Sequence, residues 1–89
     1  MTAWTDDAQP ALTSIYRMQW EEAQQCHVLL FPEGMIKLNG PAAEILQRCD
    51  GNTSVAALVA DLERTFGERD LHADVLEFLE QAHGRHWIR

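Results

Sequence analysis

The sequence predicts an α+β domain with a winged-helix-like plan, in which a three-stranded antiparallel sheet is followed by a three-helix bundle. Three observations point to this fold class. Apolar residues alternate with polar ones early in the chain, and after residue 39 they recur every three or four positions. Glycine and proline stand where one pattern gives way to the next. The 89 residues, 46% of them hydrophobic, suffice for one domain with a single core.

Three short stretches of β-forming residues predict the strands. Residues 14–20 alternate apolar and polar side chains, as a half-buried strand does. Residues 25–31 are rich in Val, Leu and Phe, and residues 35–38 form a shorter third stretch. Between the last two stands Pro32–Gly34, a turn in which proline presets φ and glycine tolerates a positive φ. Short connections between consecutive strands predict an antiparallel meander.

Three helices are predicted to follow, each with an apolar stripe and residues that typically start or stop a helix. The helices are expected to begin at Asn39–Pro41, Ser54 and Asp70 and to end at Asp50–Gly51, Gly67 and Gly84. The short apolar tail Trp87–Ile88 is expected to lie against the edge of the sheet.

Residues 1–12 have no periodicity and are predicted to form a flexible N-terminal arm ahead of a single folded domain, residues 13–89. Trp4 is the exception within the arm. Its large apolar ring is expected to dock, either on its own domain or on a second copy of the chain.

The net charge of −7 limits the classes of partner. An acidic surface repels phosphate backbones and anionic lipid, so we expect neither nucleic acid nor membrane as a partner, and none of the predicted helices is basic. The charge suits a partner with a basic patch. The N-terminus lacks the basic and apolar regions of a signal peptide, and no apolar run is long enough to span a bilayer. A cytoplasmic location is therefore expected.

The sequence shows no arrangement of residues typical of a catalytic or metal centre. His83 and His86 are three apart, but no further ligand stands at zinc spacing. Cys26 and His27 are adjacent, so on a strand they point to opposite faces. Cys49 lies at a predicted helix C-terminus, which disfavours a thiolate. We predict reduced, structural cysteines, no metal, no cofactor and no enzymatic activity.

A binding surface remains. If residues 35–38 form an edge strand, their backbone N–H and C=O groups are free to pair with an added strand. A groove between this strand and residues 71–83 would add apolar pockets, because Leu76 lies off the core-facing stripe. The alternative is that Leu76 belongs to the core and that the chain's own tail covers the strand. The pattern supports both equally.

Several segments of the chain also carry a family resemblance. They are Tyr16–Trp20, Val28–Asn39, Ile45–Leu46, Cys49–Gly51 and Asp74–Leu79. These segments closely resemble the PqqD family, coenzyme PQQ synthesis protein D, over nearly the whole folded part. Gly40–Pro41 and His86–Trp87 depart from the family's usual residues, but they affect only a helix cap and a terminus.

The resemblance implies a peptide chaperone, a recognition element for ribosomally made and modified peptides (RiPPs). It implies binding of the precursor peptide PqqA and presentation to PqqE, a radical S-adenosylmethionine enzyme that cross-links a Glu and a Tyr toward pyrroloquinoline quinone (PQQ). In related elements the peptide adds beside the third strand and packs on the third helix. The matching positions are Met35, Ile36, Lys37 and Leu38, with Val75, Leu76, Leu79 and His83 assigned by helical spacing. Lys37 would meet an acidic peptide side chain, or else serve as a solvent-facing lysine that blunts the edge.

A different class of function fits the same pattern. In this alternative the chain is a winged-helix structural or regulatory domain that homodimerises through its N-terminal arm and its edge strand. Its support is the tryptophan in the arm, which makes exchange between two copies plausible.

Overall fold

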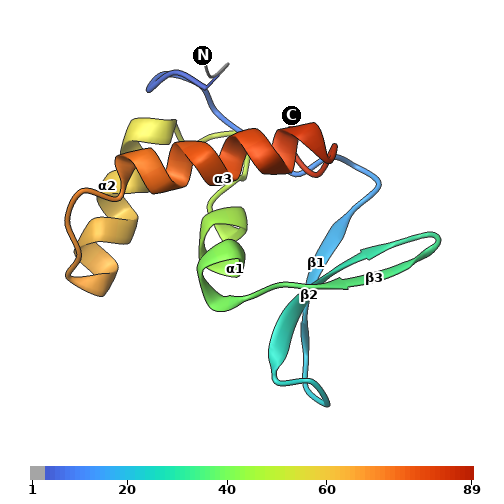
Figure 1. The fold of residues 1–89 in the computed structure, drawn as a ribbon. Coiled ribbons are helices and arrows are strands. Elements are labelled where there is room, and N and C mark those ends of the chain that lie inside the picture. Colours follow the sequence, from blue (N-terminus) through green and yellow to red (C-terminus); the bar gives the residue numbers. More distant parts are fainter. Residues whose placement is uncertain (1–3) are drawn as a thin grey trace.

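The computed structural model describes residues 4–89, which form three strands followed by three helices (Figure 1). The elements are β1 (Arg17–Glu21), β2 (Cys26–Phe31), β3 (Gly34–Lys37), α1 (Gly40–Gln47), α2 (Val55–Phe66) and α3 (His72–Gly84). Helix α1 contacts β2 and α2, and α2 contacts α3. The predicted α+β class, with the sheet first and the helices second, is confirmed.

The sheet is antiparallel with the order β1–β2–β3, so β2 is its central strand. Met18 of β1 and Ile36 of β3 both lie opposite Leu29, which has no exposed surface. These three side chains pack into the core. Because successive side chains along a strand point to opposite faces, Met35 and Lys37 lie on the other face, where they are exposed.

The first strand begins later than predicted. Residues 13–16 form a turn in which the Tyr16 N–H donates to the Thr13 carbonyl at 3.1 Å. The alternating pattern that predicted a strand from residue 14 therefore includes a turn, and Ile15 is 59% exposed there.

Local capping explains where the first two helices begin. The Asn39 side chain accepts a hydrogen bond from the Ala42 N–H at 2.8 Å, and the Ser54 hydroxyl accepts one from the Ala57 N–H at 3.1 Å. Each bond satisfies an N–H that the helix itself leaves free. Gly67 ends α2 with a left-handed φ of +64°. The two predicted helix starts, at Asn39 and Ser54, and the predicted stop at Gly67 are confirmed.

Two predicted helix ends are wrong. Asp70 does not cap α3: its φ is +60°, and the residue before the helix is Leu71, whose N–H donates to the Glu63 carboxylate at 3.0 Å. Helix α1 ends at Gln47 rather than at residues 50–51. The chain leaves the helix early because the Cys49 carbonyl accepts the Leu12 N–H at 3.2 Å, which is a contact with a distant segment.

Residues 4–12 lie against the helices. Trp4 is 8% exposed and meets the His83 ring edge-on, with 5.5 Å between ring centroids. The Val55 N–H donates to the Ala8 carbonyl at 2.8 Å, so the segment also contacts the start of α2. Trp4 thus docks on its own domain, one of the two options that the sequence left open. Residues 1–3 of the predicted arm lie outside the described residues, and the mobility of the arm stays a prediction.

The C-terminal tail forms its backbone pairs with the N-terminal segment and not, as expected, with the edge of the sheet. Leu12 and Ile88 form an isolated antiparallel bridge, and the Thr13 N–H donates to the Trp87 carbonyl at 2.8 Å. The tail is held by the N-terminal segment because that segment offers it backbone partners.

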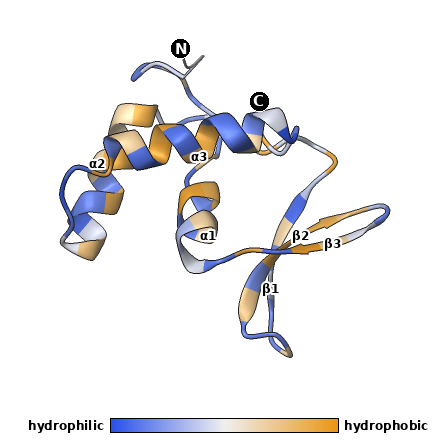
Figure 2. Ribbon diagram, viewed as in Figure 1, coloured by the Kyte–Doolittle hydropathy of each residue, from blue (hydrophilic) through white to orange (hydrophobic). Residues whose placement is uncertain are grey.

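The core lies where the sheet and the helices meet, and its largest fully buried side chains include Leu29, Leu58, Leu79 and Ile88. Figure 2 shows hydrophobic and hydrophilic residues alternating along α3, as expected for a helix with one face in the core. Within residues 4–89, none of the helices is long and apolar enough to cross a membrane.

Candidate binding groove

The outer edge of β3 is open. β3 pairs with β2 and, among residues 4–89, with no second strand. The Leu38 N–H donates to the His27 carbonyl at 3.0 Å, toward β2. Because backbone groups alternate in direction along an antiparallel strand, the N–H and C=O groups of Lys37 and Met35 point away from β2. These groups form a short ladder to which another strand could bond.

A groove of about 400 Å³ lies beside this edge, between β3 and α3. Its lining includes Ile36 and Lys37 from the strand with Leu38 just after it, and Asp74, Phe78, Gln81 and Ala82 from the helix with Arg85 and Trp87 just after it. Leu38, Ala82 and Trp87 are buried, and Ile36 and Phe78 are half-buried. The groove therefore joins apolar surface to a free backbone edge.

Two basic residues stand among the lining residues of this groove. Lys37 is exposed on the edge strand, and the Arg85 guanidinium lies 5.2 Å from the centre of the Trp87 ring. The ring face attracts the cation and steadies its position. Asp74 is the acidic residue of the lining. Positive charge beside an apolar groove favours a ligand that carries carboxylates along an apolar strand.

The structure brings together only part of the predicted set of site residues. Ile36, Lys37 and Leu38 line the groove, while Met35 is 44% exposed on the outer face of the same strand. Leu79 has no exposed surface, so it supports α3 from within the core. Val75 is 2% exposed and lines a neighbouring cavity instead.

Leu76 and His83 lie on a side of α3 that residues 4–12 approach. His83 contacts Trp4, and His72 Nε2 lies 2.8 Å from a carboxylate oxygen of Asp6. Leu76 follows His72 by one helical turn and packs against the core. The N-terminal segment thus occupies the side of the helix that the sequence left available for a peptide.

The helix residues that do face the groove were missed. Asp74, Phe78, Gln81 and Arg85 are spaced by four, three and four positions, which places them on one face of a helix. That spacing is visible in the sequence. Three of the four side chains are polar, so the apolar stripe of the helix does not reveal this face.

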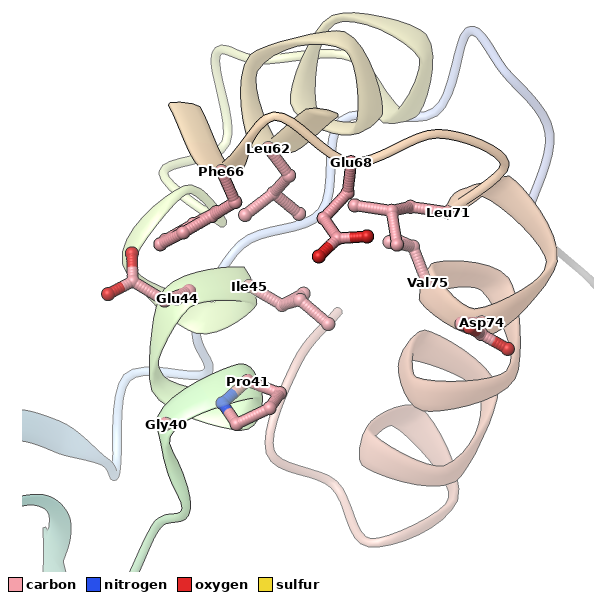
Figure 3. A pocket seen from close by; sticks show the side chains of 10 residues that line it. All are labelled: Gly40, Pro41, Glu44, Ile45, Leu62, Phe66, Glu68, Leu71, Asp74 and Val75. Carbon is pink, nitrogen blue, oxygen red and sulfur yellow. The ribbon is translucent and has the colours of Figure 1, made fainter. Parts of the chain in front are cut away.

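A second, larger cavity of about 550 Å³ adjoins the groove and lies among α1, α2 and α3 (Figure 3). Its apolar lining includes Ile45, Leu62, Phe66, Leu71 and Val75. Glu44, Glu68 and Asp74 are its charged lining residues, and the Glu68 carboxylate reaches over the opening in Figure 3. Pro41, Ile45 and Asp74 line both cavities, so the two adjoin one another.

The Cys49–Asp50–Gly51 triplet forms a turn between α1 and α2 and contains no reactive thiol. Burial, with a further contribution from the charge of Asp50, raises the pKa of Cys49 to about 12, and the thiol donates to the Ile45 carbonyl at 3.3 Å. The Asn52 N–H and the Thr53 hydroxyl bond the Asp50 carboxylate and lower its pKa. Among residues 4–89, no cluster of three His, Cys, Asp or Glu side chains could hold a metal ion.

Comparison with known proteins places this architecture in a family. The family model described as Coenzyme PQQ synthesis protein D (PqqD) matches residues 26–88. A protein named PqqA binding protein in Azotobacter vinelandii is 58% identical over 80 residues, which cover 89% of this chain and 87% of the relative. The protein of the same name in Pseudomonas paraeruginosa is 52% identical over 83 residues, which cover 92% of this chain and 90% of the relative.

Two solved structures share the fold. One is the solution structure of the PqqD truncation of Methylobacterium extorquens PqqCD, described as a stand-alone RiPP recognition element; it matches with a TM-score of 0.79 at 27% identity, covering 99% of this chain and 96% of that one. The crystal structure of PqqD from Xanthomonas campestris matches with a TM-score of 0.58 at 31% identity, and the match covers 96% of this chain and 97% of that one. The descriptions of these structures and of the relatives name a recognition element and a binding protein. They agree with the prediction that the protein is a binding protein and not an enzyme. The chain belongs to the coenzyme PQQ synthesis protein D (PqqD) family.

Proposed function

We propose that this protein is a cytoplasmic peptide chaperone of PQQ biosynthesis, which binds the precursor peptide PqqA and presents it to the enzyme PqqE. The peptide adds as a strand to the open edge of β3 and places side chains in the groove between β3 and α3. Relatives that carry the name PqqA binding protein, and a match described as a RiPP recognition element, support the peptide partner.

The observation that carries the proposal is the open edge beside the apolar groove. The outward backbone groups of Lys37 and Met35 offer hydrogen bonds to a strand of any sequence, which supplies affinity. Every second side chain of that strand would then turn toward the groove, where Ile36 and Phe78 distinguish apolar from polar residues.

Charge refines the choice of peptide. Lys37 and Arg85 favour an acidic side chain in the strand, whereas the net charge of −7 favours a basic surface on the enzyme that receives the peptide. The two preferences differ, so peptide and enzyme need not compete for one surface.

A pair of variants at one position tests strand addition. Lys37→Pro removes an N–H that points away from β2, and proline is tolerated on an edge strand in that orientation. Lys37→Ala removes the same side chain but keeps the N–H. Calorimetric titration with the A. vinelandii PqqA peptide should show binding about tenfold weaker for Lys37→Pro than for Lys37→Ala, since a peptide carbonyl loses its partner. Equal affinities in two folded variants, as judged by circular dichroism, would falsify strand addition at this edge.

Presentation to PqqE needs its own measurement. PqqE should cross-link PqqA faster with this protein present than without it, and Lys37→Pro should reduce the gain. This protein alone should leave the mass of the peptide unchanged, and a mass change without PqqE would overturn the proposal. Light scattering covers the remaining possibility: a tight dimer that ignores PqqA would indicate the structural or regulatory domain instead.

A further inference from the structure

The cavity among α1, α2 and α3 has no role in strand addition, yet it adjoins the groove that does. We propose that it receives an apolar side chain from the part of the same peptide that lies N-terminal to the strand added to β3, and that a Lys or Arg next to that side chain pairs with Glu68. The inference rests on the proposed function and extends it to a second anchoring point.

The chain itself leads from the edge of β3 to the cavity. After Lys37 the chain passes through Leu38 and Asn39 to Gly40 and Pro41, which line the second cavity. Pro41 also lines the groove beside β3. A peptide that follows the edge of β3 past Lys37 is therefore led to this opening.

The direction of the peptide follows from the sheet. Both existing pairs of strands are antiparallel, and antiparallel pairing is the more stable and more frequent arrangement. A strand antiparallel to β3 has its N-terminal end beside Lys37, because β3 itself ends there. The segment that reaches the cavity is then the one that precedes the added strand.

The lining of the cavity selects an apolar side chain. Ile45, Leu62 and Val75 are buried in the core and present apolar surface to the cavity. Phe66 is 49% exposed at the same place, one of four large hydrophobic side chains left open in residues 4–89. A volume of about 550 Å³ is in the range of small-ligand pockets and has room for an aromatic ring.

Charge selects what stands next to that side chain. All the charged lining residues of this cavity are acidic, and neither Glu68 nor Asp74 forms an ion pair within the described part of the chain. Glu44 is already paired with Arg48 at 3.0 Å. The neighbouring groove shares Asp74 but adds Lys37 and Arg85. The cavity is acidic and the groove is basic on balance, so together they would favour one orientation of a peptide that is basic at its N-terminal side and acidic in the strand.

Two variants with matched controls test the second anchor, with the A. vinelandii PqqA peptide as the probe. Phe66→Ser removes the exposed ring, and Ile15→Ser removes an apolar side chain of similar exposure (59%) that lines neither cavity. Glu68→Lys reverses a charge at the cavity, and Glu77→Lys makes the same reversal at an exposed position of α3 outside both cavities.

We expect Phe66→Ser and Glu68→Lys each to weaken binding about fivefold or more and the two controls to weaken it less than about twofold, with the Glu68→Lys effect shrinking at high salt. The effects should vanish when the peptide is shortened from its N-terminus. Unchanged affinity in folded variants, or effects that vanish only on C-terminal shortening, would overturn the inference. Lys37→Pro separates the two hypotheses: if it still binds about tenfold more weakly than Lys37→Ala, strand addition stands although the second anchor fails.

Discussion

Leu12 and Ile88 lie opposite one another in an antiparallel bridge, although they stand near the two ends of the described chain. Next to this bridge, Ala11 and Arg89 exchange two backbone hydrogen bonds of 3.0 and 2.8 Å. The Pro10 carbonyl accepts the Gly51 N–H at 2.9 Å. The N-terminal segment is therefore tied to the tail and to the turn between α1 and α2, and we expect it to contribute to the stability of the domain.

Trp4→Ala tests that contribution. Replacing a buried tryptophan by alanine should lower the free energy of unfolding by about 3 kcal/mol. Trp20→Ala is the control, because Trp20 is 46% exposed, and it should cost less than about 1 kcal/mol. Urea unfolding followed by circular dichroism measures both. Equal, small effects would show that the segment moves freely in solution, as the sequence predicts.

Gly51→Ala should destabilise the turn of the Cys49–Gly51 triplet. The φ of Gly51 is +79°, and an added Cβ would lie 3.3 Å from the Cβ of Ala11. The left-handed backbone alone costs about 1–2 kcal/mol for a residue with a side chain. Gly40→Ala is the matched control, since a Cβ there meets nothing within 4 Å. Thermal unfolding should separate the two variants, and similar melting temperatures would contradict this account of the turn.

Cys49 should resist thiol reagents in the folded protein. Burial raises its pKa to about 12, so almost no thiolate exists at pH 8. Cys26 is half-buried and serves as the internal comparison. Mass spectrometry after iodoacetamide treatment should find the label on Cys26 first, and labelling of Cys49 only in denaturant. Equal labelling rates at the two sites without denaturant would disprove the assignment.

The same pKa gives a dependence on alkaline pH. A raised pKa in the folded state means that the folded state holds the Cys49 proton more tightly than the unfolded state does. Its contribution to stability is therefore complete below the unfolded pKa of 9.0 and is lost as pH rises toward about 12. Stability measured between pH 8 and 11 should fall less steeply for Cys49→Ala than for the wild type.

Asp61 gives the opposite dependence, at acid pH. Its carboxylate lies 2.6 Å from Arg48 Nε and 2.8 Å from Arg64, and the hydrogen bond from Arg48 is the largest cause that lowers its pKa. A lowered pKa gives stability that is present above the usual value of 3.8 and is lost as pH falls below it. Asp61→Asn should therefore lower the melting temperature at pH 7 and lower it less at about pH 2. Asp7→Asn makes the same substitution at an exposed position and serves as the control.

Local chemistry made much of the fold predictable. The caps at Asn39 and Ser54 and the stop at Gly67 each depend on a few neighbouring atoms, and the sequence contains all of them. Asp70 failed as a cap because Glu63, eight residues before Leu71 and on the preceding helix, supplies the carboxylate that bonds the start of α3. A capping residue in the sequence thus indicates a bond that a residue of another helix can replace.

The sequence predicts the strand that borders the groove, but not which face of α3 borders it. The edge position of β3 follows from the strand order, which short turns largely determine. Which face of α3 stays open depends on where residues 4–12 lie, and their contacts join positions far apart in the sequence, such as Trp4 with His83. A prediction that treats this segment as mobile leaves the Leu76 side of α3 free and moves the helical part of the site to it.

The pairing of residues 11–13 with residues 87–89 has a consequence for how the domain can be used. The chain segments that lead into β1 and out of α3 therefore lie side by side, so both ends of this part of the domain are at one place on its surface. Such a unit can be inserted into a surface loop of another protein without stretching that loop. Placed within a peptide-modifying enzyme, it would raise the local concentration of bound substrate at the active site without any new contact.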